Sequence, residues 1–437
     1  MQLKTHTYKK TLLNKALPNK MRIAIIGSGI AGNTLASHLY RNHDITVFEA
    51  NSYIGGHTHT HNIEIDGKNY AVDTGFIVFN NRTYPEFINI LDMHKVAWQP
   101  SNMSFSVRCE ATGLEYNGTT LNSLFAQRSN LFKPSFYKMI RDILRFNKQS
   151  LELLASGSEI TMGAYLAQNN YGQRFINQYI IPMGAAIWST DAAQMLQFPA
   201  RFFVRFFHHH GMLSVNNRPQ WLTITGGSAR YVEAITEPFK HKIKLNSAVK
   251  SVKRDAKQVQ ITLQNGDTAQ FDYVFFACHS DEALAMLGAD ANDEEKEILS
   301  AIPYQKNNVY LHTDANLMPK RKLAWAAWNY HLPLLPSNKV AVTYNMNILQ
   351  NIDCQQPILV TLNHTNNIDP AKIIKRLQYT HPIYTLAGAA AQLRHAEISG
   401  HNRTGFAGAY WLNGFHEDGV KSALTALEHF RASQASA

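Results

Sequence analysis

Blocks of apolar and polar residues near the start of the chain predict alternating strands and helices. Residues 22–26, Arg-Ile-Ala-Ile-Ile, form a short β-branched run that predicts a strand. A glycine-rich turn at 27–32 follows, and apolar residues then recur at helical spacing to about Tyr40. Residues 44–48, Asp-Ile-Thr-Val-Phe, predict a second strand. This order of strand, turn, helix and strand is typical of an α/β fold.

The middle of the chain, residues 120–210, has a mostly helical pattern. Residues 134–146 repeat apolar positions at helical spacing, which indicates an amphipathic helix packed on the core. Residues 179–188 are apolar but contain Pro182, and they could line an apolar tunnel. Residues 198–210 combine paired phenylalanines with arginines and three consecutive histidines. This composition suits either an interfacial membrane segment or a buried aromatic helix with a polar end, and both interpretations stay open.

Charge and composition narrow the classes of partner. The formal net charge of +10 favours an anionic partner, which could be a cofactor phosphate, an acidic lipid surface or nucleic acid. Nucleic acid is disfavoured because the basic residues are dispersed and no zinc-finger or RRM signature occurs. No run of 18 apolar residues occurs, so no membrane-spanning helix is predicted. Residues 1–20 carry five lysines and no acid, and we expect a disordered basic extension.

The three cysteines, Cys109, Cys278 and Cys354, are far apart and form no CxxC pair. Neither a disulfide framework nor a cysteine zinc site is therefore indicated, and a reducing cytoplasm fits best.

The glycine-rich turn has the spacing of a dinucleotide-binding motif. Gly27 allows the tight turn, Gly29 lets the backbone approach a pyrophosphate, and Gly32 lets the helix pack on the strand. The second strand ends at Glu49, twenty residues after Gly29, where a carboxylate should bind the ribose hydroxyls and repel the 2′-phosphate of NADP. The residues expected to contact the dinucleotide here are Gly27, Ser28, Gly29, Ile30, Ala31, Gly32, Glu49 and Ala50.

Residues 55–61, Gly-Gly-His-Thr-His-Thr-His, raise the question of a metal site. On an extended strand His57, His59 and His61 would share one face and could hold zinc. Two preceding glycines indicate instead a backbone that approaches another group closely.

The wider context of this segment resembles a flavoprotein superfamily. Glu49-Ala50, four further residues and then Gly55-Gly56-His57 are similar to the E-A-x(4)-G-G-R signature of amine oxidases, protoporphyrinogen oxidases and phytoene desaturases, with His57 replacing arginine. Residues 72–76, 272–279 and 404–423 are similar to further motifs of that superfamily, in the family order. The resemblance implies non-covalently bound FAD and no metal. It adds these expected FAD contacts: Gly55, Gly56, His57, Thr74, Gly75, Phe76, Val249, Ala277, Gly408, Gly414, Phe415, Glu417, Asp418, Gly419 and Val420.

The resemblance also implies an architecture of the α/β + α class. A Rossmann-type FAD-binding domain would be discontinuous, built from residues 21–80, 225–300 and 385–437. Residues 81–224 and 301–384 would form an inserted substrate domain of helices and a mixed sheet. Since His57 replaces an arginine that is always charged, we expect it to titrate near neutral pH.

Two departures from the amine oxidases of this superfamily bear on the substrate. Their usual lysine aligns with Asn308, or with Lys306 if the alignment shifts, and their aromatic cage aligns with Phe415 rather than tyrosine. Both departures favour the branch that dehydrogenates carbon–carbon bonds of an apolar, lipid, isoprenoid or fatty-acyl substrate. An amine oxidase and a catalytically silent flavin-binding partner in a lipid-modifying complex are the alternatives. The expected pocket residues are His57, Trp188, Lys306, Asn308, Trp411 and Phe415.

A cytoplasmic protein in peripheral contact with the anionic inner face of a membrane would suit such a substrate, since the chain is basic and carries aromatic residues and apolar helices.

Overall fold

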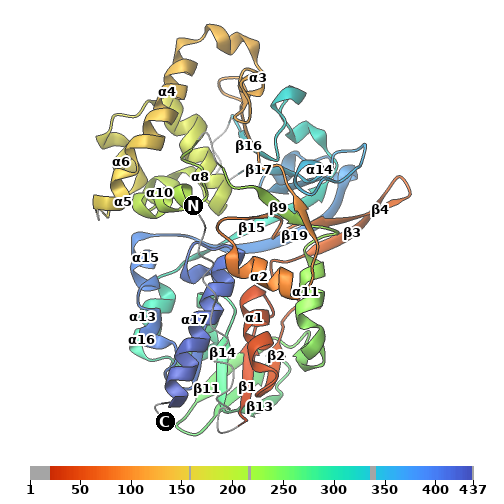
Figure 1. The fold of residues 1–437 in the computed structure, drawn as a ribbon, viewed down its shortest axis with the longest axis vertical. Coiled ribbons are helices and arrows are strands. Elements are labelled where there is room, and N and C mark those ends of the chain that lie inside the picture. The colour runs from red at the N-terminus through yellow and green to blue at the C-terminus, as the bar shows by residue number, and fades with distance from the viewer. Residues whose placement is uncertain (1–19, 157–158, 215–217, 335–340, 436–437) are drawn as a thin grey trace, which may run out of the picture.

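The computed structural model describes residues 20–156, 159–214, 218–334 and 341–435. All but the last residue of the predicted basic extension, residues 1–20, lie outside these ranges. Figure 1 shows an elongated molecule in which the first strands and the C-terminal helix lie at one end and the helical segment that includes α4 lies at the other.

A five-stranded parallel sheet forms the end of the molecule that carries the glycine-rich turn. Its strand order is β10-β2-β1-β14-β20, so strands distant in sequence are neighbours. The predicted strands at 22–26 and 44–48 are confirmed as the central strand β1 and its neighbour β2. The bounds are β1 Arg22–Ile26, β2 Asp44–Phe48, β10 Ile243–Lys244, β14 Tyr273–Phe276 and β20 Thr404–Phe406.

Both faces of this sheet are buried, which explains why β1 is apolar at consecutive positions. Ile23 and Ile25 face the helices α1 (Ile30–Leu39) and α17 (His416–Ala435). Ala24 and Ile26 face the opposite layer, in which a three-stranded antiparallel sheet packs with further helices. That layer contains β11 Val249–Arg254, β12 Val259–Leu263, β13 Thr268–Phe271, α12 Ser280–Leu287, α13 Asp293–Ser300 and α16 His395–Ile398.

A second, seven-stranded mixed sheet has the order β19-β15-β18-β17-β16-β7-β8. Its strands are antiparallel except for the parallel pair β16 and β7. The bounds are β7 Phe105–Cys109, β8 Leu114–Asn117, β15 Tyr304–His312, β16 Trp328–Leu332, β17 Val342–Asn345, β18 Leu359–Leu362 and β19 Ile373–Pro382. Two smaller sheets are the hairpin β3 Thr60–Ile65 with β4 Lys68–Asp73, and the strands β5 Phe79–Asn80, β9 Trp221–Ile224 and β6 Trp98–Pro100.

Helices fill most of residues 121–209, as predicted, and pack around one large apolar core. The predicted helix at 134–146 is confirmed within α4, and Pro182 lies in the first turn of α8, where proline is tolerated. The helices are α3 Leu121–Leu124, α4 Pro134–Gln149, α5 Glu152–Ser156, α6 Met162–Gln168, α7 Gln173–Phe175, α8 Ile181–Trp188, α9 Ala192–Gln197 and α10 Ala200–His209. The remaining α-helices are α2 Pro85–Met93, α11 Ala229–Thr236, α14 Met346–Leu349 and α15 Leu386–Gln392.

The aromatic segment at 198–210 forms α10, and the interfacial interpretation of it is wrong. Phe203 and Phe207 are 0% and 1% exposed, and Phe206 is also buried. The rings of Phe203 and Phe206 contact Trp188, Phe206 also stacks on Phe415, and Phe207 stacks on Phe203, so these rings lie inside the core and present no aromatic surface to a membrane. Within the described ranges, no helix is long and apolar enough to cross a bilayer.

Candidate functional site

The carboxyl ends of β1, β14 and β20 meet around the glycine-rich turn. Gly27 has a φ of 103°, and a Cβ there would lie 2.8 Å from the carbonyl oxygen of Ala277. A Cβ at Gly32 would lie 2.0 Å from the carbonyl oxygen of Gly27, so only glycine lets α1 pack so closely. The structure thus places Ala277, a predicted cofactor contact, directly against the turn.

The N-terminus of α1 has the features of a phosphate-binding site. The helix begins at Ile30 with no side-chain cap and no acidic residue in its first turn. A Cβ built at Gly29 would meet no atom within 4 Å. The first turn of α17 lies alongside, because a Cβ at Gly419 would be 2.6 Å from Ile30 Cγ2. Two helix N-termini therefore lie close together, and their partial positive charges would stabilise a pyrophosphate and a reduced ring.

Glu49 is buried at the end of β2, where the dinucleotide ribose is expected. Its Oε2 accepts hydrogen bonds from the backbone N–H of Ser28 at 3.0 Å and from the Ser28 hydroxyl. Its Oε1 accepts from the backbone and side-chain amides of Asn51, both at 2.8 Å. A ribose hydroxyl would replace one of these donors. The Ser28 hydroxyl can rotate away from Glu49 and leave its place to the ribose. The backbone N–H of Ser247 donates to the Glu49 carbonyl at 2.8 Å. This bond brings Val249, the first residue of β11, close to the expected ribose site.

The loop at 55–57 lies between the glycine-rich turn and the segment 72–76, which is similar to a motif of the superfamily. A Cβ at Gly56 would lie 3.2 Å from Gly29 Cα, and one at Gly75 would lie 2.1 Å from the His57 carbonyl oxygen. Phe76 also donates its N–H to that carbonyl at 2.8 Å. Three motifs that are separate in sequence are therefore in contact, and their close backbones explain the glycines.

His57 lies in a cluster of aromatic side chains. Its ring centroid is 5.2 Å from Tyr379, 5.3 Å from His381 and 6.0 Å from His279. The Nε2 atom is buried without a hydrogen-bond partner, which suits a polar cofactor beside it. Burial first, and then the neighbouring histidines, lower the pKa of His57 well below its usual value. The expectation that His57 titrates near neutral pH is therefore wrong, because the ring is neutral there.

The three alternating histidines do not share one face. The strand β3 begins only at Thr60, so His57 lies before it. His59 stacks on Tyr53 at 3.9 Å, approaches His61 at 4.0 Å and hydrogen-bonds the hydroxyl of Tyr379 at 3.1 Å, whose ring also borders His57. Among residues that the structure describes, no group of three or more potential ligands could hold a metal ion.

Strand β15 brings a different residue to His57 than the sequence suggested. Lys306 and Asn308 are exposed, so these two predicted pocket residues point away from the cluster. Asn307 between them is fully buried and pairs across the strands with Tyr379. Its Nδ2 donates to His381 Nδ1 at 3.1 Å. Because side chains alternate along a strand, Asn307 is the residue of β15 that faces the site.

Asn307, Tyr379 and His381 were all missed from the sequence. Residues 304–312 alternate too weakly between polar and apolar types for the inward face to be recognised, and β19 lies about seventy residues further along the chain.

The C-terminal motif brings Phe415 and Trp188 together. Phe415 stacks on Phe206 at 4.9 Å, and Trp188 Nε1 donates to the Asn413 carbonyl at 3.3 Å. Trp411 instead stacks on His395 at 4.1 Å in the layer behind the five-stranded sheet, so the structure does not place it with the other pocket candidates.

Of the four FAD contacts predicted in α17, two use their side chains to bind other parts of the protein and two place their backbone beside the expected cofactor site. Glu417 accepts from the backbone N–H groups of Glu86 and Phe87, at the start of α2, and Asp418 accepts from the Phe415 N–H at 2.9 Å. These carboxylates therefore hold protein elements together. The backbone at Gly419 and Val420 remains beside α1 and would approach the cofactor.

A cavity of about 500 Å³ opens beside Phe415. It is bounded by residues 82–85 before and at the start of α2, by 208–210 at the end of α10, and by the first turns of α17. Gly414, with a φ of 90°, turns the chain here, and its Cβ would lie 2.5 Å from the Tyr384 hydroxyl. Gly408 lies earlier in the motif, where a Cβ would lie 2.3 Å from the Tyr410 ring.

The residues present fit a dinucleotide flavin. Glu49 would bind the ribose, and Ser28, Gly29 and the N-terminus of α1 would bind the pyrophosphate. Gly56, His57 and the N-terminus of α17 would lie against the ring. The unpartnered Nε2 of His57 and the open space at Gly29 are the observations that support this fit.

Comparison with known proteins matches most of the chain to a flavin-containing family. Residues 30–356 match the sequence model of the flavin containing amine oxidoreductases. A comparison with curated protein sequences finds no significant match.

Several solved structures share the fold at low sequence identity. A fatty acid isomerase from P. acnes that produces CLA has a TM-score of 0.68 and 17% identity, with 94% of this chain and 98% of that chain covered. Cyclohexylamine oxidase from Brevibacterium oxydans has a TM-score of 0.66 and 14% identity, with 94% and 100% covered. Reduced UDP-galactopyranose mutase has a TM-score of 0.66 and 16% identity, with 95% and 94% covered.

Proposed function

The chain belongs to the flavin containing amine oxidoreductases, and on that premise we propose that this FAD-dependent oxidoreductase dehydrogenates an apolar lipid, isoprenoid or fatty-acyl substrate. When bound, FAD supplies the hydride acceptor at N5. The protein has to hold the cofactor, place a C–H bond against it and exclude water.

The inward face of β15 is the observation that carries this proposal. In the amine oxidases that the chain resembles, a lysine lies on the corresponding strand near the flavin. Here the inward residue is the neutral Asn307, while Lys306 lies on the opposite, exposed face. His57 and His381, which lie near Asn307, are neutral as well, because burial lowers the pKa of His57 far below its usual value and that of His381 to about 4. A neutral, buried surface of this kind favours an apolar substrate over one that arrives as an ammonium ion.

The surroundings of Phe415 support the same substrate class. Phe206 and Trp188 are both buried, and the core around them is formed by apolar and aromatic side chains of α8 and α10. Apolar packing of this kind behind Phe415 offers few hydrogen bonds, which suits an alkyl or isoprenoid chain, whereas the cavity on the outer side of Phe415 is also lined by charged side chains, among them Arg82 and Lys421. The fold alone does not choose the substrate, since the similar structures include both a fatty acid isomerase and an amine oxidase.

Spectroscopy on the purified holoprotein tests the proposal. Oxidised flavin should absorb near ~370 and ~450 nm, and anaerobic addition of a bacterial lipid extract should bleach the longer-wavelength band. Putrescine and cyclohexylamine should leave it unchanged. The variant Lys306→Met should bleach at the rate of the wild type, because Lys306 lies on the outer face.

Three other results would each point elsewhere. Bleaching by the amines and not by the extract would replace the proposal with amine oxidation. A flavin that no substrate reduces but dithionite does would favour the catalytically silent partner. Absence of both absorption bands would contradict the cofactor itself.

A further inference from the structure

The segment between β8 and the middle of α4 exposes large apolar side chains to solvent. Phe132 is 85% exposed and Leu121 is 78% exposed, and Leu131, Tyr137 and Leu144 are also exposed. Figure 1 shows that α3, α4 and the chain between them form the end of the molecule opposite to β1 and the C-terminus. Buried Phe136, Met139 and Phe146 hold α4 on the core, so the exposed residues belong to a helix that is already packed.

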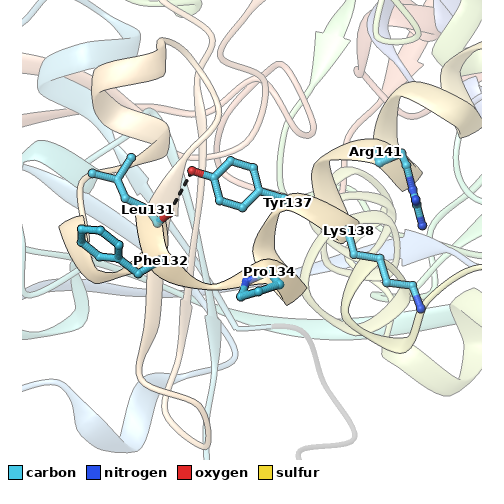
Figure 2. A pocket seen from close by; sticks show the side chains of 6 residues that line it. All are labelled: Leu131, Phe132, Pro134, Tyr137, Lys138 and Arg141. Atoms are coloured by element: carbon cyan, nitrogen blue, oxygen red, sulfur yellow. Dashed lines mark hydrogen bonds between the residues drawn. The ribbon is translucent and has the colours of Figure 1, made fainter.

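Figure 2 shows how Leu131, Phe132 and Tyr137 of this segment are arranged. Leu131, Phe132, Pro134 and Tyr137 line an open cavity of about 520 Å³ together with Lys138 and Arg141. The Tyr137 hydroxyl donates to the Leu131 carbonyl at 3.0 Å, which ties the start of α4 to the preceding turn. The aromatic and aliphatic groups therefore form a fixed surface with two cations beside it.

Nearly all of the charged residues in this segment are basic. Residues 116–151 contain six basic residues, and the only acid among them is Asp142, which is buried and forms an ion pair with Arg145. The neighbouring turn at 320–323 packs close to α3 and adds exposed Lys320, Lys322 and Leu323. Exposed cations thus surround exposed apolar groups over the whole tip.

We propose that this tip, residues 121–145 with the turn at 320–323, docks on the surface of an anionic lipid bilayer. Exposed Phe132, Leu121 and Leu131 would enter the boundary between headgroups and acyl chains, while Lys138 and Arg141 contact the phosphates. The surface is distinct from residues 198–210, whose rings are buried. This inference does not depend on the proposed reaction, although an enzyme that acts on lipids would gain access to its substrate.

Two other occupants agree less well with the observations. A second copy of the chain would bring the same basic residues face to face, and like charges repel across such a symmetric interface. Nucleic acid would bind the cations through its phosphates but would gain little from the exposed leucines and Phe132 beside them.

Co-sedimentation with lipid vesicles tests the inference on the full-length holoprotein. The wild type should bind vesicles that contain phosphatidylglycerol and not pure phosphatidylcholine, and salt should weaken the binding. The double variant Lys138→Gln, Arg141→Gln should bind about 25-fold more weakly, at about fivefold for each charge removed. Phe132→Ser should bind roughly tenfold more weakly, since a buried phenyl ring is lost. Full flavin absorbance should confirm that each variant is folded.

Matched controls come from other surfaces of the protein. Lys253→Gln, Lys257→Gln removes the same charge from exposed positions of β11 and the following turn, and Leu393→Ser removes an apolar residue that is 89% exposed. Both should bind like the wild type.

Equal losses in the tip and control variants would overturn the inference and would indicate binding through total charge. Unchanged binding in the tip variants would do so as well, and would leave the basic residues 1–20 or another surface as the contact. Tight binding to duplex DNA that needs Lys138 and Arg141 but not Phe132 would identify a polyanion site instead. If the wild type binds no vesicle, the inference is wrong, whereas the proposed reaction would be unaffected.

Discussion

Asn307 and His381 are hydrogen-bonded side chain to side chain between the neighbouring strands β15 and β19, with 3.1 Å from Nδ2 to Nδ1. Because the amide donates, Nδ1 of His381 accepts, and the neutral ring must carry its proton on Nε2. The amide oxygen of Asn307 accepts in turn from Asn363 at 2.8 Å. This chain of bonds fixes both the tautomer and the orientation of a ring that lies 5.3 Å from His57.

Replacing Asn307 by alanine should slow reduction of the flavin by its substrate about tenfold to a hundredfold, because the His381 ring loses its orientation. Stopped-flow measurement of flavin bleaching under anaerobic conditions checks this. In the control variant Asn308→Ala, which changes the next residue on the outer face of β15, the flavin should be reduced at the wild-type rate. Equal rates for Asn307→Ala and Asn308→Ala would show that His381 is not positioned for the reaction. The same loss in both variants would show a general effect on β15.

Gly29→Ala should leave the stability of the apoprotein unchanged and weaken FAD binding at least tenfold. The backbone at Gly29 has a φ of −68°, which any residue adopts, and the added Cβ meets no protein atom within 4 Å. It would occupy the space that the pyrophosphate needs. Quenching of FAD fluorescence during reconstitution measures the affinity, and thermal melting measures the stability.

Two further glycines serve as controls for that measurement. Gly118→Ala also meets no atom within 4 Å, but it lies far from the site and should behave as the wild type. Gly32→Ala should destabilise the fold itself, since its Cβ would lie 2.0 Å from a backbone oxygen. Normal FAD affinity in Gly29→Ala would place the pyrophosphate elsewhere.

Because of His416, the free energy of unfolding should fall as the pH is lowered below about 6.5. It is buried, its Nε2 hydrogen-bonds Thr58 and Tyr231, and burial lowers its pKa from 6.5 to about 3. The unfolded chain therefore takes up a proton first as the pH falls, so this contribution to stability is complete above pH 6.5 and is lost progressively toward pH 3. At pH 5 the loss is about 2 kcal/mol.

Urea unfolding of the holoprotein at pH 7.5 and at pH 5 checks this. In His416→Gln the difference between the two pH values should shrink by about 2 kcal/mol relative to the wild type. His241→Gln, at an exposed position, should keep the wild-type difference. A His416→Gln variant that loses stability in acid as steeply as the wild type would contradict the assignment.

Glu295→Gln should lower the free energy of unfolding by about 3–5 kcal/mol. Glu295 is 1% exposed, and both of its oxygens accept from the buried guanidinium of Arg254, at 2.6 and 2.8 Å. Removing the carboxylate charge leaves Asp290, 2.6 Å from Nε, as the remaining carboxylate beside the buried Arg254 guanidinium, and the side of the guanidinium that faced Glu295 loses its ionic partner. The exposed pair of Lys296 and Asp293, one residue along on the same helix, is the control, and Lys296→Ala should cost less than about 1 kcal/mol. A loss for Glu295→Gln no larger than that control would rule out a stabilising role for the buried pair.

The cofactor side of the site was predictable because its constraints are local. Gly27, Gly32 and Glu49 have fixed spacings that follow from one turn, one helix and one strand, and each lies where its spacing indicated. The substrate side was not predictable in the same way. Whether Lys306 or Asn307 faces inward depends on the register of β15 with β19, which the local sequence does not determine.

The environment of single residues also required the fold. The phenylalanines of α10 have the composition of a membrane segment, and only their contacts with Trp188 and Phe415 show that they are core. His57 has an ordinary titratable side chain, and its low pKa results from burial against His381 and His279, which are distant in sequence.

The strand order β10-β2-β1-β14-β20 also has a consequence for biosynthesis. About 350 residues separate β2 from β20, which a ribosome takes roughly 20 to 70 s to synthesise. During that time α17 has not yet covered Ile23, Ile25 and α1, and the edge of β14, once that strand has been made, lacks its partner strand until β20 follows. The nucleotide sheet can therefore close only after β20 and α17 have been made, and the flavin site is complete only then.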